Sequence, residues 1–197
     1  MANCCSTRIT INHASESELL EFEKLIENWV GMDTSGEYFK DSWLGNIVLK
    51  SGIGTIDTNP ETDLKCCGDI TWMRYKDNQL SIDTETAWSP VLKMWVKLLE
   101  KYLPDAELIY QTEECGCALY ATNDPCLENY YVIDCWDVKE INTDYEASEE
   151  TVREILQELL NTTEDDIEEL INMIKDSEYK DKMAVHKWEY RDVQEWD

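Results

Sequence analysis

Basic side chains are scarce in this chain of 197 residues. Only 17 lysines and arginines stand against 43 aspartates and glutamates, which gives a formal net charge of −26 at pH 7. A field of this sign repels phosphate backbones, so direct binding to DNA or RNA is disfavoured. The same field attracts basic surfaces and accelerates encounters with them. High net charge is also typical of proteins that are merely soluble.

Long apolar runs are missing as well. None approaches the ~20 residues that a membrane-spanning helix needs. The opening residues, MANCCSTRIT, lack the basic start and the apolar stretch of a secretory signal. The sequence therefore predicts a cytoplasmic protein.

Glycine and histidine, which many catalytic and nucleotide sites require, number only 7 and 2. Gly52 and Gly54 lie in SGIGTIDTNP, which has neither the lysine nor the following helix of a phosphate-binding loop. His13 and His186 are far apart in sequence, and no local signature pairs either one with a nucleophilic cysteine. We therefore expect no catalytic residues and no cofactor.

A Cys-x-x-Cys motif is absent, although eight cysteines are present: Cys4, Cys5, Cys66, Cys67, Cys115, Cys117, Cys126 and Cys135. Structural zinc sites usually combine two such motifs or mix cysteine with histidine. Adjacent cysteines on a strand point to opposite faces, which suits chelation poorly. We interpret the cysteines as buried thiols that act as small hydrophobes. A zinc site and disulfides remain alternatives, and no metal is expected.

The residues that are present can build a core, since 43% are hydrophobic and 8 are tryptophan. TRITIN alternates polar and apolar residues, as a half-buried strand does. In SESELLEFEKLIENWV the apolar residues are three and four apart, and Ser15 with Glu18 predicts a capping box at a helix start. Residues 31–68 read as an insertion with one helix that Gly52 ends, and its apolar face is Phe39, Trp43, Leu44, Ile47 and Val48.

The middle of the chain predicts two strands, a helix and more strands. DITWMRY and QLSIDTETAW form a hairpin across KDN. SPVLKMWVKLLEKYLP is a helix in which Ser89 is the expected cap and Pro90 the first helical residue. AELIYQTEE, CALYATND and YYVIDCW are further strands. This order predicts an α+β fold, a ferredoxin-like two-layer sandwich over residues 1–140 with helices on one face of an antiparallel sheet.

Residues 141–197 predict an acidic helical hairpin and a tail. The apolar residues Val152, Ile155, Leu156, Leu159 and Leu160 share one helix face. Thr163 is the expected start of a second helix with Ile167, Leu170, Ile171 and Ile174 on its apolar face. The last segment, KMAVHKWEYRDVQEWD, fits a strand and a helix equally well.

Several of these stretches carry a resemblance to a known family. They are MANCCSTRITINHASESELLEFEKLIE, WLGNIV, CCGDITWM and LSIDTETAWSPVLKMWVKLLEKYLPDAELIYQTEECGCALYATND, and they lie in a pattern that covers about residues 1–136. The pattern resembles YubB-type ferredoxin-like proteins of plasmids, phages and other mobile elements. A departure is Cys4, where the family often has tryptophan, and the usual Glu-x-Gly segment is here Glu114-Cys115-Gly116. The resemblance implies a fold and a mobile-element origin, and with it a bacterial host cell, but no activity and no catalytic residues.

Paired carboxylates near strand ends are one alternative source of chemistry. Glu113 and Glu114 end one predicted strand, and Asp83 and Glu85 lie on a neighbouring one. Such pairs serve as general acid and base when their surroundings push their pKa values apart. Adjacent strand residues face opposite ways, so Glu113 and Glu114 do not form one pair.

Acidic residues concentrate between Asp137 and Glu178, where 15 acids and three bases give a net charge of −12. Glu150, Glu154 and Glu158 are four apart, so a helix stacks their carboxylates about 6 Å apart along one face. That spacing is of the order of the phosphate spacing along a nucleic-acid strand. The expected partner-binding residues are Glu149, Glu150, Glu154, Glu158, Glu164, Asp165, Asp166, Glu168, Glu169 and Asp176.

These observations favour a non-enzymatic accessory protein of a mobile element. It would mimic nucleic acid and inhibit a basic host protein such as a nuclease, in the manner of anti-CRISPR or anti-restriction proteins. A solvated helix face is the simplest alternative. Divalent-cation binding is another, although no EF-hand spacing is present. A metal protein or enzyme that uses cysteines or carboxylates, and a scaffold that buries its tryptophans, remain open as well.

Overall fold

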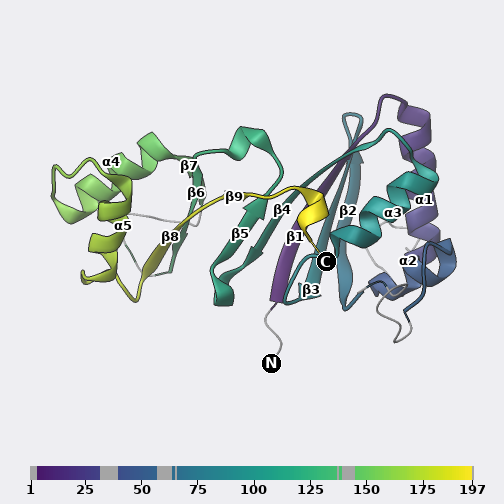
Figure 1. Ribbon diagram of the computed structural model, residues 1–197, viewed down its shortest axis with the longest axis horizontal. Coiled ribbons are helices and arrows are strands. Elements are labelled where there is room, and N and C mark those ends of the chain that lie inside the picture. The colour runs from purple at the N-terminus through teal and green to yellow at the C-terminus, as the bar shows by residue number, and fades with distance from the viewer. Residues whose placement is uncertain are drawn as a thin grey trace. The chain divides into compact units, whose positions relative to one another are not determined.

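The computed structural model describes residues 4–31, 40–56, 64, 66–136, 138 and 145–196, apart from the side chains of Cys115 and Tyr145 (Figure 1). It is a mixed α+β fold with helices, a six-stranded sheet and a three-stranded sheet, which confirms the predicted α+β class. The chain forms two compact units, residues 1–124 with 191–197 and residues 125–190. No helix in the described segments is both long enough and apolar enough to span a membrane.

The first unit places three helices on one side of an antiparallel sheet (Figure 1). The five strands that this unit contributes to the six-stranded sheet follow the order β2-β3-β1-β4-β5. The strands are β1 (Cys4–Asn12), β2 (Gly68–Lys76), β3 (Gln79–Ala87), β4 (Glu107–Glu114) and β5 (Leu119–Thr122). The helices are α1 (Glu16–Val30), α2 (Leu44–Ser51) and α3 (Leu92–Tyr102), with short 3-10 turns η1 (Cys115–Cys117) and η3 (Val193–Glu195).

The first two helices begin or end where the sequence predicts. Ser15 caps α1 by accepting a hydrogen bond from the Glu18 amide, and Gly31 ends this helix at φ 61°. Gly52 ends α2 at φ 65°, as expected. Glycine suits both positions because a left-handed φ costs it little. The predicted apolar face of α2 is buried at Leu44, Ile47 and Val48, but Trp43 precedes the helix and is 40% exposed, and Phe39 lies outside the described residues.

The predicted start of α3 is wrong by two residues. The helix begins at Leu92, and Val91 precedes it without a side-chain cap. Ser89 is instead part of a turn, because its carbonyl accepts the Thr86 hydroxyl at 2.9 Å and its amide donates to the Ala87 carbonyl. Trp88 has a φ of 72° in that turn. This tight turn uses the residues that would otherwise cap and start the helix.

The predicted β2–β3 hairpin is confirmed, and it contains a β-bulge that the sequence does not predict. Asp77 and Asn78 both have positive φ, as a two-residue type I′ turn requires. Ile70 pairs with Thr84 and Trp72 pairs with Asp83, so the register shifts by one residue between them. The extra residue, Thr71, forms a β-bulge. A bulge exchanges the faces to which later side chains of the strand point.

The end of the chain, whose structure the sequence leaves open, returns to the first unit. The Arg191 amide donates to the Thr122 carbonyl at 2.9 Å. The hydroxyl of Tyr110, a residue that is 1% exposed, donates to the Arg191 carbonyl at 3.0 Å and accepts the Trp196 indole N–H at 2.6 Å. The side chains of Val193 and Trp196 pack against the core. The buried Tyr110 of β4 therefore holds Arg191 and Trp196 in place through two hydrogen bonds.

The pH dependence of stability in Tyr110→Phe tests the role of these two hydrogen bonds. Burial raises the pKa of Tyr110 to about 12, above the ordinary value of 10 that applies in the unfolded chain. A raised pKa means that the folded state favours the neutral phenol. The contribution of the Tyr110 hydroxyl to the free energy of unfolding is therefore complete below pH 10. It is lost as pH rises from 10 towards 12. We expect Tyr110→Phe to lower the free energy of unfolding at pH 7 by about 1–2 kcal/mol, since the Trp196 and Arg191 groups lose their partner.

Denaturant unfolding at pH 8, 10 and 11 measures this effect. The wild type should lose stability across that range, and the difference between wild type and Tyr110→Phe should shrink. Tyr190→Phe is the matched control, because Tyr190 is 57% exposed. A wild-type-minus-variant difference that stays constant with pH would show that the Tyr110 hydroxyl does not act as described.

The second unit has a three-stranded antiparallel sheet with the order β7-β6-β8. Its strands are β6 (Tyr130–Cys135), β7 (Tyr145–Ser148) and β8 (Met183–Lys187), followed by the short β9 (Glu189–Tyr190). Its helices are α4 (Glu149–Leu160) and α5 (Ile167–Lys175), and η2 (Pro125–Leu127) is a 3-10 turn. Strand β6 is the predicted YYVIDCW strand, and it lies in this sheet rather than in the sheet of the first unit.

The core of the second unit lies between this sheet and the two helices. Ile133 of β6 is fully buried together with Val152 and Leu156 of α4 and Leu170 of α5. Val152 and Leu156 are four residues apart, so they share one face of α4. The opposite face of the helix is left for polar residues.

Candidate acidic interface on α4 and α5

Helix α4 carries its acidic residues away from the core. Ser148 caps it by accepting a hydrogen bond from the Thr151 amide at 3.4 Å, and Asn161 ends it at φ 50°. Glu150, Glu154 and Glu158 are exposed at successive turns of the helix. Three carboxylates therefore line one side of α4, about 6 Å apart by the rise of an α-helix.

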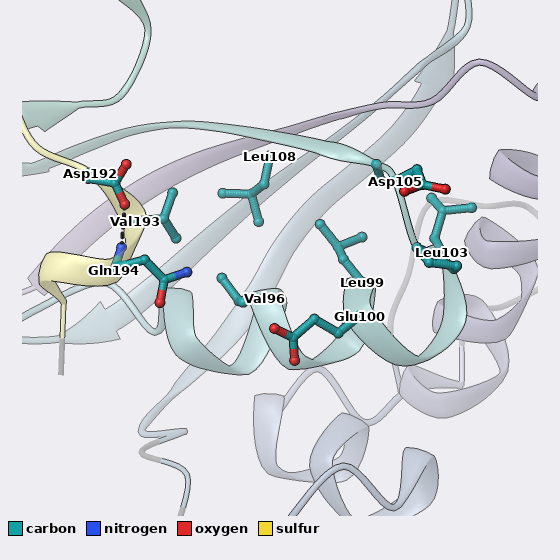
Figure 2. A pocket seen from close by; sticks show the side chains of 11 residues that line it. Val96, Leu99, Glu100, Leu103, Asp105, Leu108, Asp192, Val193 and Gln194 are labelled. Carbon is teal, nitrogen blue, oxygen red and sulfur yellow. Dashed lines mark hydrogen bonds between the residues drawn. The ribbon is translucent and has the colours of Figure 1, made fainter.

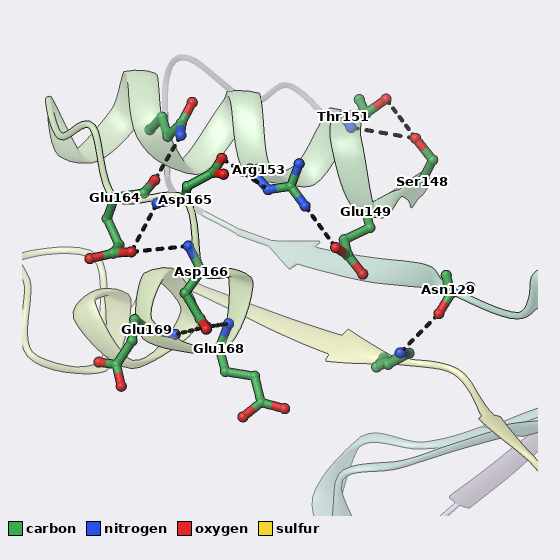
Figure 3. Close-up of polar contacts among 12 residues, drawn as sticks. Asn129, Ser148, Glu149, Thr151, Arg153, Glu164, Asp165, Asp166, Glu168 and Glu169 are labelled. Atoms are coloured by element: carbon green, nitrogen blue, oxygen red, sulfur yellow. Dashed lines mark hydrogen bonds and ion pairs between the residues drawn. The ribbon is translucent and has the colours of Figure 1, made fainter.

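Helix α5 begins four residues later than the predicted start at Thr163. Its first residue is Ile167, and its cap is Asp166. The Asp166 carboxylate accepts the Glu168 amide at 2.9 Å and the Glu169 amide at 3.1 Å (Figure 3). Aspartate is a strong N-cap because its carboxylate satisfies free amides and the positive end of the helix dipole.

The loop between α4 and α5 uses its acidic side chains for internal contacts. Glu164 accepts the amides of Asp165 and Asp166 at 2.9 and 3.0 Å, and Gln157 of α4 donates to the Glu164 carbonyl at 2.7 Å (Figure 3). Asp165 lies in this loop and not on a helix face, contrary to the prediction. Loop geometry therefore occupies two predicted partner-binding carboxylates, those of Glu164 and Asp166.

Arg153 neutralises two other carboxylates of the predicted set. Its guanidinium donates to Glu149 at 2.7 Å and lies 3.6 Å from an Asp165 carboxylate oxygen (Figure 3). The Arg153 side chain is 28% exposed, so these pairs are partly shielded from water. Burial, followed by the charges of Glu149 and Glu168, raises the pKa of Tyr131 beneath them. Arg153 thus ties the loop to the first turns of α4.

The remaining predicted residues are displayed outward. All of them are exposed, and within the described part of the chain they form no ion pair. The residues are Glu150, Glu154, Glu158, Glu168, Glu169 and Asp176. We call these six residues the acidic surface. Lys175, the lysine nearest to them on α5, donates to the Asn172 side chain at 3.1 Å. The acidic surface is therefore presented to solvent on a folded two-helix framework.

Arg153→Gln should loosen this framework. We expect the free energy of unfolding of the second unit to fall by about 1–2 kcal/mol, because a partly buried charged pair is lost and Glu149 and Asp165 lose their shared cation. The loss should shrink at high salt. Lys175→Gln removes the same charge from an exposed site and should change stability by less than about 0.5 kcal/mol. Equal losses in chemical denaturation of the two variants would contradict the structural role of Arg153.

An apolar groove with an acidic rim lies on the first unit (Figure 2). Its volume is about 290 Å³, and it lies between α3, the turn before β4, and η3. Val96, Leu99 and Leu108 form apolar walls, and the carboxylates of Glu100 and Asp192 lie at its edge (Figure 2). The Asp192 carboxylate already accepts the Gln194 amide at 2.9 Å. The groove is small.

The strand-end carboxylates do not form one acid–base pair. Glu113 and Glu85 both lie beside Ser6, one on each neighbouring strand, on the sheet face away from the helices. Glu114 points the other way, is 2% exposed, and accepts the Gly116 amide at 3.0 Å. Asp83 is held by Arg8 through two contacts of 2.8 and 2.9 Å. The expectation that Glu113 and Glu114 face opposite ways is confirmed.

The interpretation of the cysteines as buried thiols is correct for only part of the set. Cys5 and Cys66 are buried, Cys135 is half-buried, and Cys4, Cys67, Cys117 and Cys126 are exposed. Burial raises the pKa of the Cys5 thiol, which lies 3.1 Å from the Thr112 hydroxyl. Several exposed cysteines lie at strand ends or in short turns, where alternation does not govern burial. Among described residues no cluster of three metal-ligating side chains is present.

The two histidines belong to different units. His13 accepts the Ser15 amide at 3.2 Å and lies next to the α1 cap. His186, on β8, lies 4.0 Å from Asp134, and burial lowers its pKa while Asp134 opposes that shift. Each histidine has a local structural role.

The tryptophans are divided between core and surface. Trp29, Trp95 and Trp188 are buried, whereas Trp43, Trp72, Trp88 and Trp136 are at least 40% exposed. The outer edge of β2 is partly covered, since Ile70 donates to the Ser42 carbonyl at 2.9 Å and Tyr75 donates to the Glu23 carboxylate at 3.1 Å. Covering an edge in this way opposes strand-to-strand association.

Comparisons with known proteins add no relative. A scan against protein-family models gives no match, and searches of curated proteins and of solved structures also give none.

Proposed function

We propose that this chain is a non-enzymatic binding protein that presents its acidic surface to the nucleic-acid-binding surface of a basic partner. The observation that carries the proposal is the display of six exposed carboxylates on two packed helices, with no ion pair to any other described residue. A row of fixed negative charges attracts a basic groove and accelerates encounter with it.

The energetics of α4 support this function. Glu150 and Glu154, and then Glu154 and Glu158, are like charges four residues apart, and each such pair costs about 0.2–0.5 kcal/mol. Burial of Val152 and Leu156 outweighs this cost and keeps the helix folded. A cationic partner would relieve the repulsion on binding. The isolated protein thus tolerates a charge pattern that suits the complex.

We also propose a finer fold assignment for each of the two units. We assign the first unit to the ferredoxin-like arrangement, supported by the strand order β2-β3-β1-β4 and by helices after β1 and β3. We assign α4 and α5 to an acidic helical hairpin, supported by their shared core residues and the short connecting loop.

The biological class follows from the resemblance together with the charge. Stretches such as CCGDITWM and KYLPDAELIYQTEECGCALYATND are similar to YubB-type proteins of plasmids and phages. A mobile element gains from an inhibitor of host nucleases in the bacterial cytoplasm. We therefore place the protein among anti-restriction or anti-CRISPR inhibitors that occupy the nucleic-acid site of a nuclease.

Affinity capture from bacterial lysate tests the proposal. The tagged protein is exposed to lysate at low salt and at roughly ten times that ionic strength, and captured proteins are identified by mass spectrometry. We expect a nuclease or another nucleic-acid-binding protein that is lost at high salt. Capture that does not change with salt, or capture of proteins without basic surfaces, would contradict the proposal.

A further inference from the structure

A surface of opposite character lies on the first unit, on the sheet face that the helices leave open. Trp72, Arg74 and Lys76 alternate along β2, so their side chains point to the same face. All three are exposed, and Trp72 is 41% exposed although its ring is the largest on this face. An indole beside two cations is unusual in a chain of net charge −26.

The bulge at Thr71 creates this surface. Ile70 is buried towards the helices, and strict alternation would place Trp72 on the same buried side. The register shift between Ile70 and Trp72 reverses the alternation, so Met73 is buried and Trp72 faces outward. Bulges are found where a strand must re-aim a side chain. The aromatic ring is thus brought to the open face by a specific backbone feature.

The three side chains line a cavity of about 440 Å³ together with Asp77 of the hairpin turn and polar residues of β1 and β3. Arg74 pairs in register with Ser81, and Lys76 pairs with Gln79, which in turn pairs with Asn12. Gln79 donates its amide N–H to the Asn12 side chain at 3.1 Å. The carbonyl oxygen of Gln79 and the hydroxyl of Ser81 can therefore meet polar groups of a ligand.

The charges around this cavity are arranged to leave a cation available. Asp83, the register partner of Trp72, is bound by Arg8 through both of its oxygens. Lys76 lies 3.5 Å from Asp77, but both side chains are highly exposed, so water screens that pair. Across the segments that the structure describes, Arg74 forms no ion pair. Arg74 can therefore bind an anion without first losing a partner.

We propose that this cavity binds a single nucleotide. A flat base stacks on the indole of Trp72, and the phosphate lies against Arg74 and Lys76. Aromatic rings bind bases through their faces, and the planar guanidinium matches phosphate oxygens in pairs. The cavity lies within the ordinary size range of small-molecule sites. A longer polyanion is disfavoured because the overall negative charge repels every further phosphate.

Titration with adenosine 5′-monophosphate, followed by the indole N–H signals in two-dimensional NMR spectra, tests the site. The signal that disappears in Trp72→Leu identifies the Trp72 indole. We expect that signal to shift in a saturable manner, while the signal of Trp136, on the second unit, stays unchanged. Adenosine lacks the phosphate, and inorganic phosphate lacks the base. Each should bind at least about tenfold more weakly than adenosine 5′-monophosphate.

Matched variants distinguish specific nucleotide binding in this cavity from non-specific electrostatic attraction. Trp72→Leu and Arg74→Gln should each weaken nucleotide binding by about tenfold. Trp88→Leu removes a more exposed tryptophan, and Lys93→Gln removes an exposed cation of α3; both should bind as the wild type does. Circular dichroism establishes that each variant is folded. An unsaturable wild-type titration, or equal loss in the control variants, would overturn the proposal.

Discussion

Replacing the acidic surface with amides is expected to abolish salt-sensitive capture of the basic partner. The variant combines Glu150→Gln, Glu154→Gln, Glu158→Gln, Glu168→Gln, Glu169→Gln and Asp176→Asn. Electrostatic steering changes association rates by about 10–1,000-fold, so we expect an association rate at least tenfold lower at low salt. The variant should fold as well as the wild type, because removing like charges four apart relieves about 0.2–0.5 kcal/mol per pair.

A control with the same change in formal charge separates a specific surface from net charge. It neutralises six exposed carboxylates of the first unit, namely Glu18, Glu21, Glu85, Glu100, Asp105 and Glu107. Surface plasmon resonance against the captured partner should show a nearly normal association rate for this control. If both variants lose binding equally, the partner responds to overall charge, and α4 and α5 hold no docking surface.

Leu170→Ala is expected to produce the largest loss of stability in the second unit. Leu170 is fully buried between α5 and the rest of that core, and truncating a buried leucine costs about 2–5 kcal/mol. The unit has 66 residues (125–190), so a loss of this size is a large part of what so small a core supplies. We expect loss of helical signal from α4 and α5 and, with it, loss of partner binding although every carboxylate remains.

Met173→Ala is the matched control on the same helix. Met173 is 38% exposed, so its truncation should cost less than about 1 kcal/mol and leave binding intact. Thermal and denaturant unfolding measure the stabilities, and the binding assay above measures affinity. Retained binding by an unfolded Leu170→Ala second unit would mean that charge density alone suffices, without the helical framework.

Local signals in the sequence predicted much of the fold. Ser15 starts α1 and Gly52 ends α2 by capping chemistry that involves residues only a few positions away. The turn at Asp77 and Asn78 joins two strands whose residues are adjacent in sequence. Such features depend on short-range backbone preferences, which is why residue type and spacing reveal them.

Features that depend on distant residues were not predictable. The bulge at Thr71 reverses the expected faces of Trp72 and Arg74, and no residue type in DITWMRY marks it. The return of Trp196 to Tyr110 joins residues 86 positions apart. The tail pattern fits strand and helix equally, so only tertiary contacts determine its position.

The candidate site was predicted in part for the same reason. The outward row of Glu150, Glu154 and Glu158 follows from helical periodicity alone. The roles of Asp165 and Asp166 do not, because a carboxylate at the start of a helix can cap it, pair with an arginine or face solvent. Counting charges along the chain could not distinguish these outcomes.

Competition with duplex DNA for the captured partner tests the central claim most directly. The protein and a labelled duplex are added to the purified partner, and the bound fraction of each is followed by fluorescence anisotropy. Occupation of a nucleic-acid groove predicts mutual exclusion, in which rising protein concentration releases all of the DNA and the amide variant releases almost none. A stable complex that contains partner, DNA and this protein together would contradict the account.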